Sequence, residues 1–129
     1  MNDLIPQLEA TGIGCYINNI FLGSLMFADD LVLLAPTRSA MQKLINICES
    51  FCSEHCLSFN AKKTKAMVFG KSFDKIEISP LYLNNEPIQF VHEWKYLGCL
   101  VCSGKELTFS AKKRSLFLSL FSQLHLNRC

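Results

Sequence analysis

The stretch SLMFADDLVLLAP, residues 24–36, decides the fold, because it places two adjacent aspartates inside the most apolar segment of the chain. Apolar residues on both sides of ADD predict the two strands of a β-hairpin, with Pro36 ending the second strand. Residues 31–35 include no polar side chain, which is typical of a strand covered on both faces. A carboxylate in such a segment is costly unless it is paired, hydrogen-bonded or bound to a metal. We therefore expect Asp29 and Asp30 at the hairpin tip, where side chains reach past the sheet edge.

The size and composition of the chain indicate one folded domain. It has 129 residues, of which 50% are hydrophobic and 19% are charged, and this excludes a disordered protein. The two aspartates interrupt the best candidate for a membrane span, which needs ~18 apolar residues. The N-terminal sequence MNDLIPQLEA lacks the basic start of a secretory signal. We therefore expect an intracellular protein, nuclear or cytoplasmic, with no membrane partner.

Charge is distributed unevenly between the two halves of the chain. Residues 1–60 carry two basic and six acidic side chains, whereas residues 61–129 carry eleven basic and five acidic ones. An acidic first half and a basic second half fit a metal site beside a surface that binds a polyanion. Ordinary solvated surface charge explains the same counts, and on charge alone we favour that interpretation.

The seven cysteines are an odd number in a chain without a signal sequence, which predicts reduced thiols. Cys48, Cys52 and Cys56 recur every fourth residue beside His55, so zinc is one interpretation. The C-x-x-C at residues 99–102 has no second pair to complete a ligand set. Buried cysteines pack as small apolar residues on one side of a helix, and we favour that interpretation.

Strand and helix signals alternate along the chain, which predicts an α+β fold. Asn18 and Asn19 mark a turn, and Ser39 with Gln42 forms a capping box at the start of a helix. The expected elements are, in order, strands within residues 15–27, a strand at 31–35, a helix over 39–57, an alternating strand at 65–69, short strands at 76–78, 81–83 and 88–90, a hairpin around Gly98, and a helix over 108–126.

Side-chain periodicity assigns faces to two of these elements. In residues 65–69, Ala66 and Val68 alternate with Lys65, Met67 and Phe69, so the two sets face opposite sides of a strand. The side of the helix that we expect to face the core carries Met41, Leu44, Ile45, Cys48, Phe51, Cys52 and His55.

Two neighbouring carboxylates at a rigid hairpin tip suit a hard divalent cation. Oxygen ligands select Mg²⁺ or Mn²⁺ over zinc, and a pair of such ions promotes phosphoryl transfer. Successive strand side chains face opposite ways, so one aspartate is expected to be the main ligand and the other auxiliary. The alternative is structural, because aspartate is common in turns, where its side chain caps local amides.

The stretch FADDLVLLAP resembles the catalytic hairpin of reverse transcriptases, specifically the non-LTR retrotransposon (LINE-type) enzymes. Other segments resemble motifs of the same family in the same order. NDL resembles the end of the preceding helix, and GCYINNIFLGSLMFADD resembles the strands that approach the hairpin. LSFNAKKTKAMVFG resembles the next motif, with Asn60, Lys63 and Thr64 at its defining positions, and FVHEWKYLGCLV resembles the primer-grip hairpin. The resemblance runs from about residue 2 to the end.

The resemblance implies a fold and a role for each matching residue. The fold is a partial polymerase palm over residues 1–104, made of a catalytic β-hairpin, a packed helix and small antiparallel strands with the primer-grip hairpin, followed by the start of a thumb helix over 105–129. Asp29 would bind Mg²⁺ or Mn²⁺ with Asp30 as its weaker companion, and Lys63 would be a catalytic residue near the incoming triphosphate. The residues that would contact nucleic acid are Phe27, Trp94, Tyr96, Leu97, Gly98, Lys112, Lys113 and Arg114.

Each role has a plainer structural alternative. Lys63 could be one of three lysines on a solvated strand edge, and the WKYLG segment could be a core hairpin. The KKR segment at 112–114 could be a solvated helix start.

The sequence also departs from the family pattern. The family's palm needs a further aspartate from an upstream strand, but the acids before Asp29 are Asp3 and Glu9, and Asp3 matches the helix-end position instead. The fingers are not recognisable either. We therefore expect a fragment of an RNA-directed DNA polymerase that binds its metal weakly and is inactive alone. Its expected partners are an RNA template and a DNA primer or duplex.

Two other functions also fit the sequence. The chain could be a non-catalytic remnant that binds nucleic acid through its basic half. It could also be a protein-interaction remnant, because strands deprived of neighbours expose apolar area. In that case it would associate with an intact reverse transcriptase or with itself.

Overall fold

The computed structural model describes residues 3–27, 30–69, 79–96, 99–102 and 126–128. Within these ranges the chain is a mixed α+β protein with two helices and six two-stranded sheets, so the predicted α+β class is confirmed. The strand predicted at 76–78 lies outside the described residues, as does almost all of the helix predicted at 108–126. No helix in the described part of the chain is long and apolar enough to cross a membrane.

Two antiparallel hairpins build the N-terminal part of the protein. Strands β1 (Tyr16–Ile17) and β2 (Ile20–Phe21) are joined by the predicted turn, in which Asn18 and Asn19 have φ angles of 49° and 65°. Asparagine tolerates this left-handed conformation, which suits a two-residue hairpin turn. Strands β3 (Ser24–Phe27) and β4 (Asp30–Leu33) form the second hairpin, which confirms the hairpin predicted around ADD.

The first hairpin is fixed to the end of the second by a backbone hydrogen bond. The Cys15 N–H donates to the Leu34 carbonyl over 3.2 Å, while the Leu34 N–H continues the β3–β4 pairing by donating to the Gly23 carbonyl over 2.9 Å. The Phe21 ring covers Gly23 so closely that a Cβ atom there would lie 2.5 Å from Cε2 of that ring. Gly23 is therefore required by this close approach.

Helix α2 (Arg38–Glu54) follows β4, and its N-cap is Thr37, whose Oγ1 accepts the Ala40 N–H over 3.1 Å. The predicted capping box of Ser39 and Gln42 is therefore wrong. Thr37 has the extended backbone of an N-cap residue, and this starts the helix ahead of Ser39.

The Gln42 side chain is used in a tertiary contact instead. Its amide oxygen accepts the Tyr82 N–H and its amide nitrogen donates to the Tyr82 carbonyl, each over 2.9 Å. The helix ends at Glu54, before the predicted end, because Cys56 has a φ of 53° and strand β5 (Leu57–Phe59) begins directly after it.

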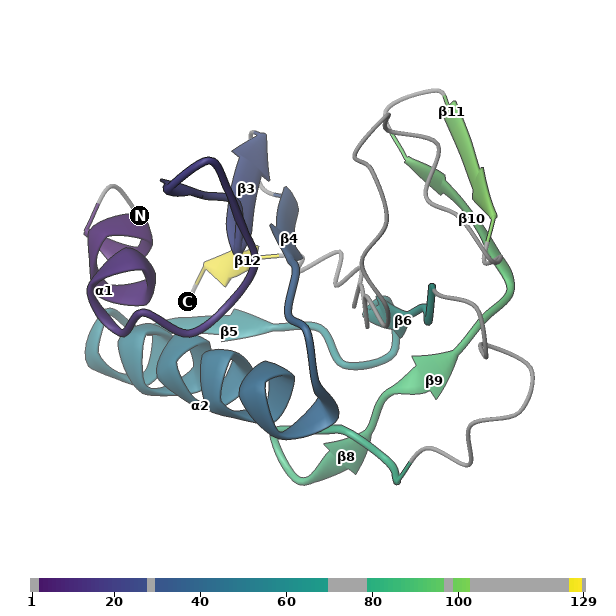
Figure 1. Ribbon diagram of the computed structural model, residues 1–129. Helices are drawn as coiled ribbons and strands as arrows, with labels where there is room; N and C mark the ends of the chain where they lie inside the picture. The colour runs from purple at the N-terminus through teal and green to yellow at the C-terminus, as the bar shows by residue number, and fades with distance from the viewer. Residues whose placement is uncertain (1–2, 28–29, 70–78, 97–98, 103–125, 129) are drawn as a thin grey trace.

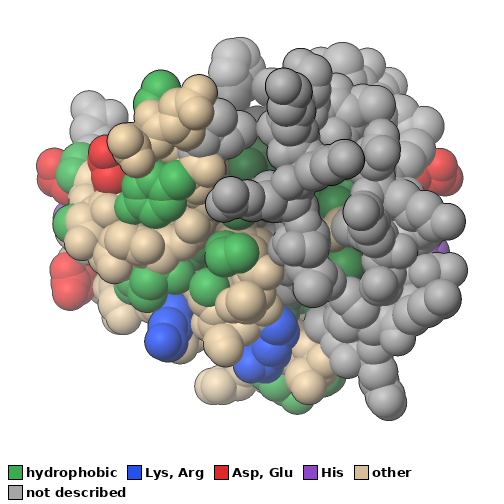
Figure 2. Space-filling view, viewed as in Figure 1, with side chains coloured by type: hydrophobic (Ala, Val, Ile, Leu, Met, Phe, Trp, Pro, Cys, Tyr) green, Lys and Arg blue, Asp and Glu red, His purple; other side chains and the backbone are tan. Residues whose placement is uncertain are grey.

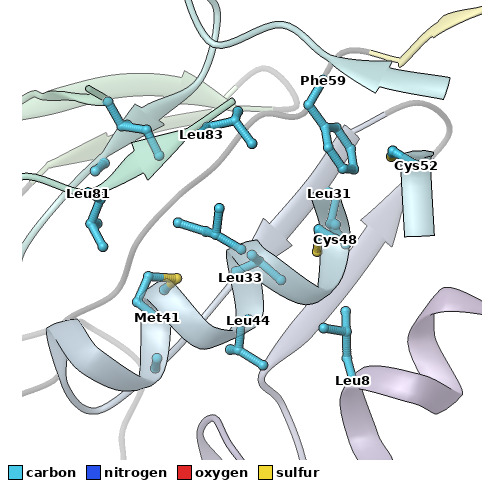
Figure 3. Close-up of a cluster of buried hydrophobic side chains, with 14 of the residues drawn as sticks. Leu8, Leu31, Leu33, Met41, Leu44, Cys48, Cys52, Phe59, Leu81 and Leu83 are labelled. Atoms are coloured by element: carbon cyan, nitrogen blue, oxygen red, sulfur yellow. The ribbon is translucent and has the colours of Figure 1, made fainter. Parts of the chain in front are cut away.

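The main core lies between α2 and strand β4 (Figures 1 and 3). Leu31 and Leu33 of β4 belong to this core, whereas Val32 belongs to a second cluster with Met67 and Phe69. Strand β4 is thus covered on both faces, as its sequence predicts. The α2 side chains buried in the main core are Met41, Leu44, Ile45, Cys48, Phe51 and Cys52, which confirms the predicted face except for His55, which lies beyond the helix and is exposed.

One further helix and four strand pairs complete the described part of the chain (Figure 1). Helix α1 (Leu4–Ala10) packs beside α2 through Leu4 and Leu8. Strand β6 (Lys65–Ala66) pairs in parallel with β9 (Gln89–Phe90). The antiparallel pairs are β7 (Tyr82–Leu83) with β8 (Glu86–Pro87), β10 (Glu93–Tyr96) with β11 (Cys99–Cys102), and β5 with β12 (Leu126–Arg128). Leu126 is therefore in a strand, and the predicted helix is wrong at that residue. Its backbone pairs with Phe59 instead.

Candidate functional site

The β3–β4 hairpin carries the two aspartates that the sequence predicts as metal ligands. Phe27 at the end of β3 pairs with Asp30 at the start of β4, so two residues of sequence connect the strands. The Asp30 side chain is partly exposed. Asp29 lies outside the described residues, and for Phe27 only the backbone is described. The metal role of the two aspartates therefore stays a prediction.

The position of Asp30 is set by the strand that follows it. Leu31 and Leu33 are buried in the main core, and Val32 is buried on the opposite face of the strand. A strand held on both faces fixes the residue at its end, as a metal site requires. Among the described residues, no three His, Cys, Asp or Glu side chains gather as a ligand set. Carboxylate oxygens such as those of Asp30 are the ligand type that Mg²⁺ and Mn²⁺ prefer.

A hydrogen-bonded turn presents Lys63 to solvent. The Asn60 side-chain oxygen accepts the N–H groups of Lys62 and Lys63 over 3.0 and 3.2 Å. The Thr64 hydroxyl is fully buried and donates to the Asn60 carbonyl over 2.9 Å. Asn60 and Thr64 therefore fold the turn, and the Lys63 side chain is exposed on it. Exposure fits both a triphosphate contact and a solvated lysine.

The β10–β11 hairpin confirms the strand pairing predicted around Gly98. Trp94 pairs with Val101 and Tyr96 pairs with Cys99, while Leu97 and Gly98 between the strands lie outside the described residues. The Trp94 side chain packs against the cluster that contains Val32 of β4. One apolar cluster thus connects the β3–β4 hairpin with the base of the β10–β11 hairpin.

The contacts of the Lys65 side chain could not be predicted from the sequence. Its Nζ lies 6.0 Å from the centre of the Trp94 ring and 2.6 Å from Oε1 of Gln89. The alternation of residues 65–69 places Lys65 on the side of Met67 and Phe69, but nothing local indicates a partner 29 positions away in the sequence. The cationic residues 112–114 lie outside the described residues, so their predicted contacts stay predictions.

The two cysteines of α2 are packing residues, so the favoured interpretation is confirmed for Cys48 and Cys52 and is wrong for Cys56. Cys48 and Cys52 are buried in the main core, whereas Cys56 lies beyond the helix and is exposed. Burial raises the pKa of the Cys52 thiol from 9.0 to about 11 and raises the pKa of Cys48 as well. Both thiols are therefore neutral over the physiological pH range.

These raised pKa values predict a loss of stability in alkali. The fold favours the neutral Cys52 thiol, so its contribution is complete below pH 9 and declines as the pH rises from 9 towards 11. Urea unfolding at pH 8 to 11 measures this decline. Cys52→Ala should make the decline shallower, while Ser53→Ala, at the exposed neighbouring residue of α2, should leave it unchanged. Equal declines in all three proteins would assign the effect to other groups.

Comparisons with known proteins agree with this arrangement. Residues 1–101 match the family described as reverse transcriptase (RNA-dependent DNA polymerase). The chain is 39% identical over 85 residues, 60% of its length, to the retrovirus-related Pol polyprotein from type-1 retrotransposable element R2 of Nasonia vitripennis. It is 34% identical over 105 residues, 76% of its length, to the polyprotein from type-2 retrotransposable element R2DM of Drosophila melanogaster. These matches cover 8% and 10% of the two polyproteins, and no solved structure matches.

Proposed function

Because this chain belongs to the reverse transcriptase (RNA-dependent DNA polymerase) family, we propose that it forms part of the palm of a retrotransposon polymerase. Residues 1–104 would be the palm with its primer-grip hairpin, and residues 105–129 would begin the thumb. The observation that carries this proposal is the β3–β4 hairpin, in which Phe27 pairs with Asp30 at the end of a strand buried on both faces. The similarity to two R2 polyproteins supports a retrotransposon origin.

The proposed metal site consists of Asp29 and Asp30 at the hairpin tip. When bound, Mg²⁺ or Mn²⁺ would activate the attacking hydroxyl and stabilise the leaving oxygen in nucleotide transfer. Asp29 would be the main ligand, Asp30 would support it, and Lys63 would contact the incoming triphosphate from its exposed turn. Two carboxylates alone hold such ions weakly. We therefore propose that residues 1–129 need further palm residues for turnover, in keeping with the much greater length of the two polyproteins.

The proposed nucleic-acid surface is the β10–β11 hairpin together with the basic second half of the chain. Trp94 joins the β10–β11 hairpin to the cluster that contains Val32 of β4. A duplex held by the β10–β11 hairpin would therefore keep a fixed distance and orientation relative to Asp30 at the tip of the β3–β4 hairpin. Phe27 would lie near the primer end, Trp94 and residues 96–98 would brace the primer backbone, and residues 112–114 would contact duplex phosphates.

Binding of an RNA–DNA hybrid tests this proposal. We expect residues 1–129 to bind a hybrid without sequence preference and with an affinity that falls steeply as salt rises, because phosphate neutralisation releases counterions. Replacing Lys112, Lys113 and Arg114 with glutamine should reduce the salt slope by about 2–3, whereas Lys43→Gln on the exposed side of α2 should not. Fluorescence anisotropy from 50 to 300 mM salt measures both. Absence of binding at 50 mM salt, or binding that ignores salt, would contradict the proposal.

A second candidate function is association with a protein partner. Four large apolar side chains are exposed in the described part of the chain: Tyr16, Ile20, Leu25 and Tyr82. Ile20, at 63% exposure, lies at the start of β2, and apolar side chains are visible on the surface shown in Figure 2. An intact reverse transcriptase or a second copy of the chain is the partner that these residues would meet. Light scattering of the purified chain distinguishes a monomer from self-association.

A further inference from the structure

Lys65 connects two sheets that lie next to each other along the chain. Its strand β6 pairs in parallel with β9, with Lys65 opposite Gln89, and the Val91 N–H extends this pairing by donating to the Ala66 carbonyl over 2.8 Å. Strand β10 starts two residues after Val91. The Lys65 ammonium therefore stands where the β6–β9 pair leads into the β10–β11 hairpin.

The position of Lys65 is unusual for a charged residue. Met67 and Phe69, which share its side of the chain, are both buried, so an apolar residue would be expected there. Lysine is accommodated because its stem can lie along apolar surface while its ammonium finds polar partners. Those partners are Oε1 of Gln89 at 2.6 Å and the Lys62 carbonyl at 3.3 Å. The ammonium also faces the Trp94 ring at 6.0 Å, within the range of a cation–π contact.

Within the described part of the chain, no hydrogen bond orients the Trp94 ring. Its Nε1 is buried, and no hydrogen-bond partner for it is found among the described residues. Apolar packing in the cluster with Met67 and Phe69 holds the ring in place without fixing its direction through a hydrogen bond. The ammonium of Lys65, itself held by Gln89, supplies a directional contact on the ring.

We propose that Lys65 is a positioning residue, which orients Trp94 and thereby sets the β10–β11 hairpin for contact with the hybrid. This inference rests on the proposed function for the role of the hairpin, whereas the orientation of Trp94 by Lys65 stands without it. The two parts are therefore tested by separate measurements on the same variants.

The first measurement uses the fact that Trp94 is the single tryptophan of the chain. In Lys65→Met the ring loses the contact that orients it and should turn towards solvent. The Trp94 emission should therefore shift to longer wavelength, and acrylamide should quench it more readily. Lys65→Arg keeps a cation that stacks on aromatic rings and should retain the wild-type emission. Lys62→Met removes the same charge from the preceding turn and is the matched control. Unchanged emission and quenching in Lys65→Met would overturn the proposal.

The second measurement is hybrid binding in a double-mutant cycle. Lys65→Met should weaken binding by about three- to tenfold, as expected from the loss of a cation–π contact. In a Trp94→Leu background the same substitution should weaken binding no more than Lys62→Met does, because the ring through which Lys65 acts is gone. Near-ultraviolet circular dichroism and urea unfolding establish that each variant is folded.

The outcomes separate the inference from the function on which it rests. If Lys65→Met weakens binding equally with and without Trp94, Lys65 contacts the phosphates directly and the positioning role is wrong. If its emission changes but its binding matches Lys62→Met, the contact is purely structural and the proposal is also wrong. If the wild-type chain does not bind the hybrid, the proposed function fails, and the emission measurement alone decides whether Lys65 orients Trp94.

Discussion

Asp29→Asn is expected to lower metal-dependent nucleotide incorporation by about 10²–10³-fold in a polymerase that contains this segment. A metal ion supplies several kcal/mol of charge stabilisation in phosphoryl transfer, and about 3–4 kcal/mol corresponds to that loss in rate. Asp30→Asn should have a smaller effect, on the order of tenfold, since we propose that Asp29 is the main ligand and Asp30 the auxiliary one. Substitution by asparagine keeps the shape of each side chain and removes its charge.

Primer extension on an RNA template with Mg²⁺ or Mn²⁺ measures both effects. Residues 1–129 alone should give no extension. The comparison is therefore made in a chimaera, in which the matching residues of this chain replace the 105-residue segment of the R2DM polyprotein. The unmodified polyprotein is the reference, and Glu54→Gln, at the exposed residue that ends α2, is the matched control. Extension that survives Asp29→Asn would contradict the metal assignment. Extension by residues 1–129 alone would contradict the proposed need for further palm residues.

Leu33→Ala is expected to destabilise the protein by about 2–5 kcal/mol, the range for truncating a buried leucine. Leu33 is fully buried, and it belongs with Leu44 of α2 to the group of side chains shown in Figure 3. Since small domains are stable by only about 5–15 kcal/mol, this single change would remove a large share of the total. Leu33 ends the strand that begins with Asp30, so the same change would loosen the hairpin tip.

The matched control is Leu25→Ala in the neighbouring strand. Leu25 pairs with Val32 across the same hairpin but is 47% exposed, so its truncation should cost less than about 1 kcal/mol. Urea unfolding followed by circular dichroism measures both variants, and the midpoint for Leu33→Ala should fall by about 1–2 M. Similar losses at the two leucines would show that the burial of Leu33 does not support the fold as described.

Local features of the fold were predictable from the sequence. Asn18 and Asn19 marked a hairpin turn because asparagine tolerates positive φ, and the apolar run after Asp30 marked a strand covered on both faces. The helix was predicted with its buried side correct except for His55 and with its ends wrong. Its start depends on which of two nearby hydroxyls, Thr37 or Ser39, takes the N-cap position, and sequence pattern alone does not distinguish them.

The candidate site was predictable where one short motif carries it. The FADD motif indicated both aspartates, and the pairing of Phe27 with Asp30 agrees with a hairpin at that point. The motif of Asn60, Lys63 and Thr64 was recognisable too, but the sequence did not indicate which of the three residues shape the turn and which is exposed. The structure shows that Asn60 and Thr64 fold the turn while Lys63 is exposed.

By itself, then, the sequence determined the family, the hairpin around the aspartates, the turn at Asn18 and Asn19, and the apolar faces, because each depends on residues within a few positions of one another. The tertiary structure decided the contacts between distant residues. Examples are the bonds from Gln42 to Tyr82, the parallel pairing of Lys65 with Gln89, and the approach of the Lys65 ammonium to Trp94. Such partners are chosen by the packing of whole elements around a shared core, and no local periodicity encodes that choice.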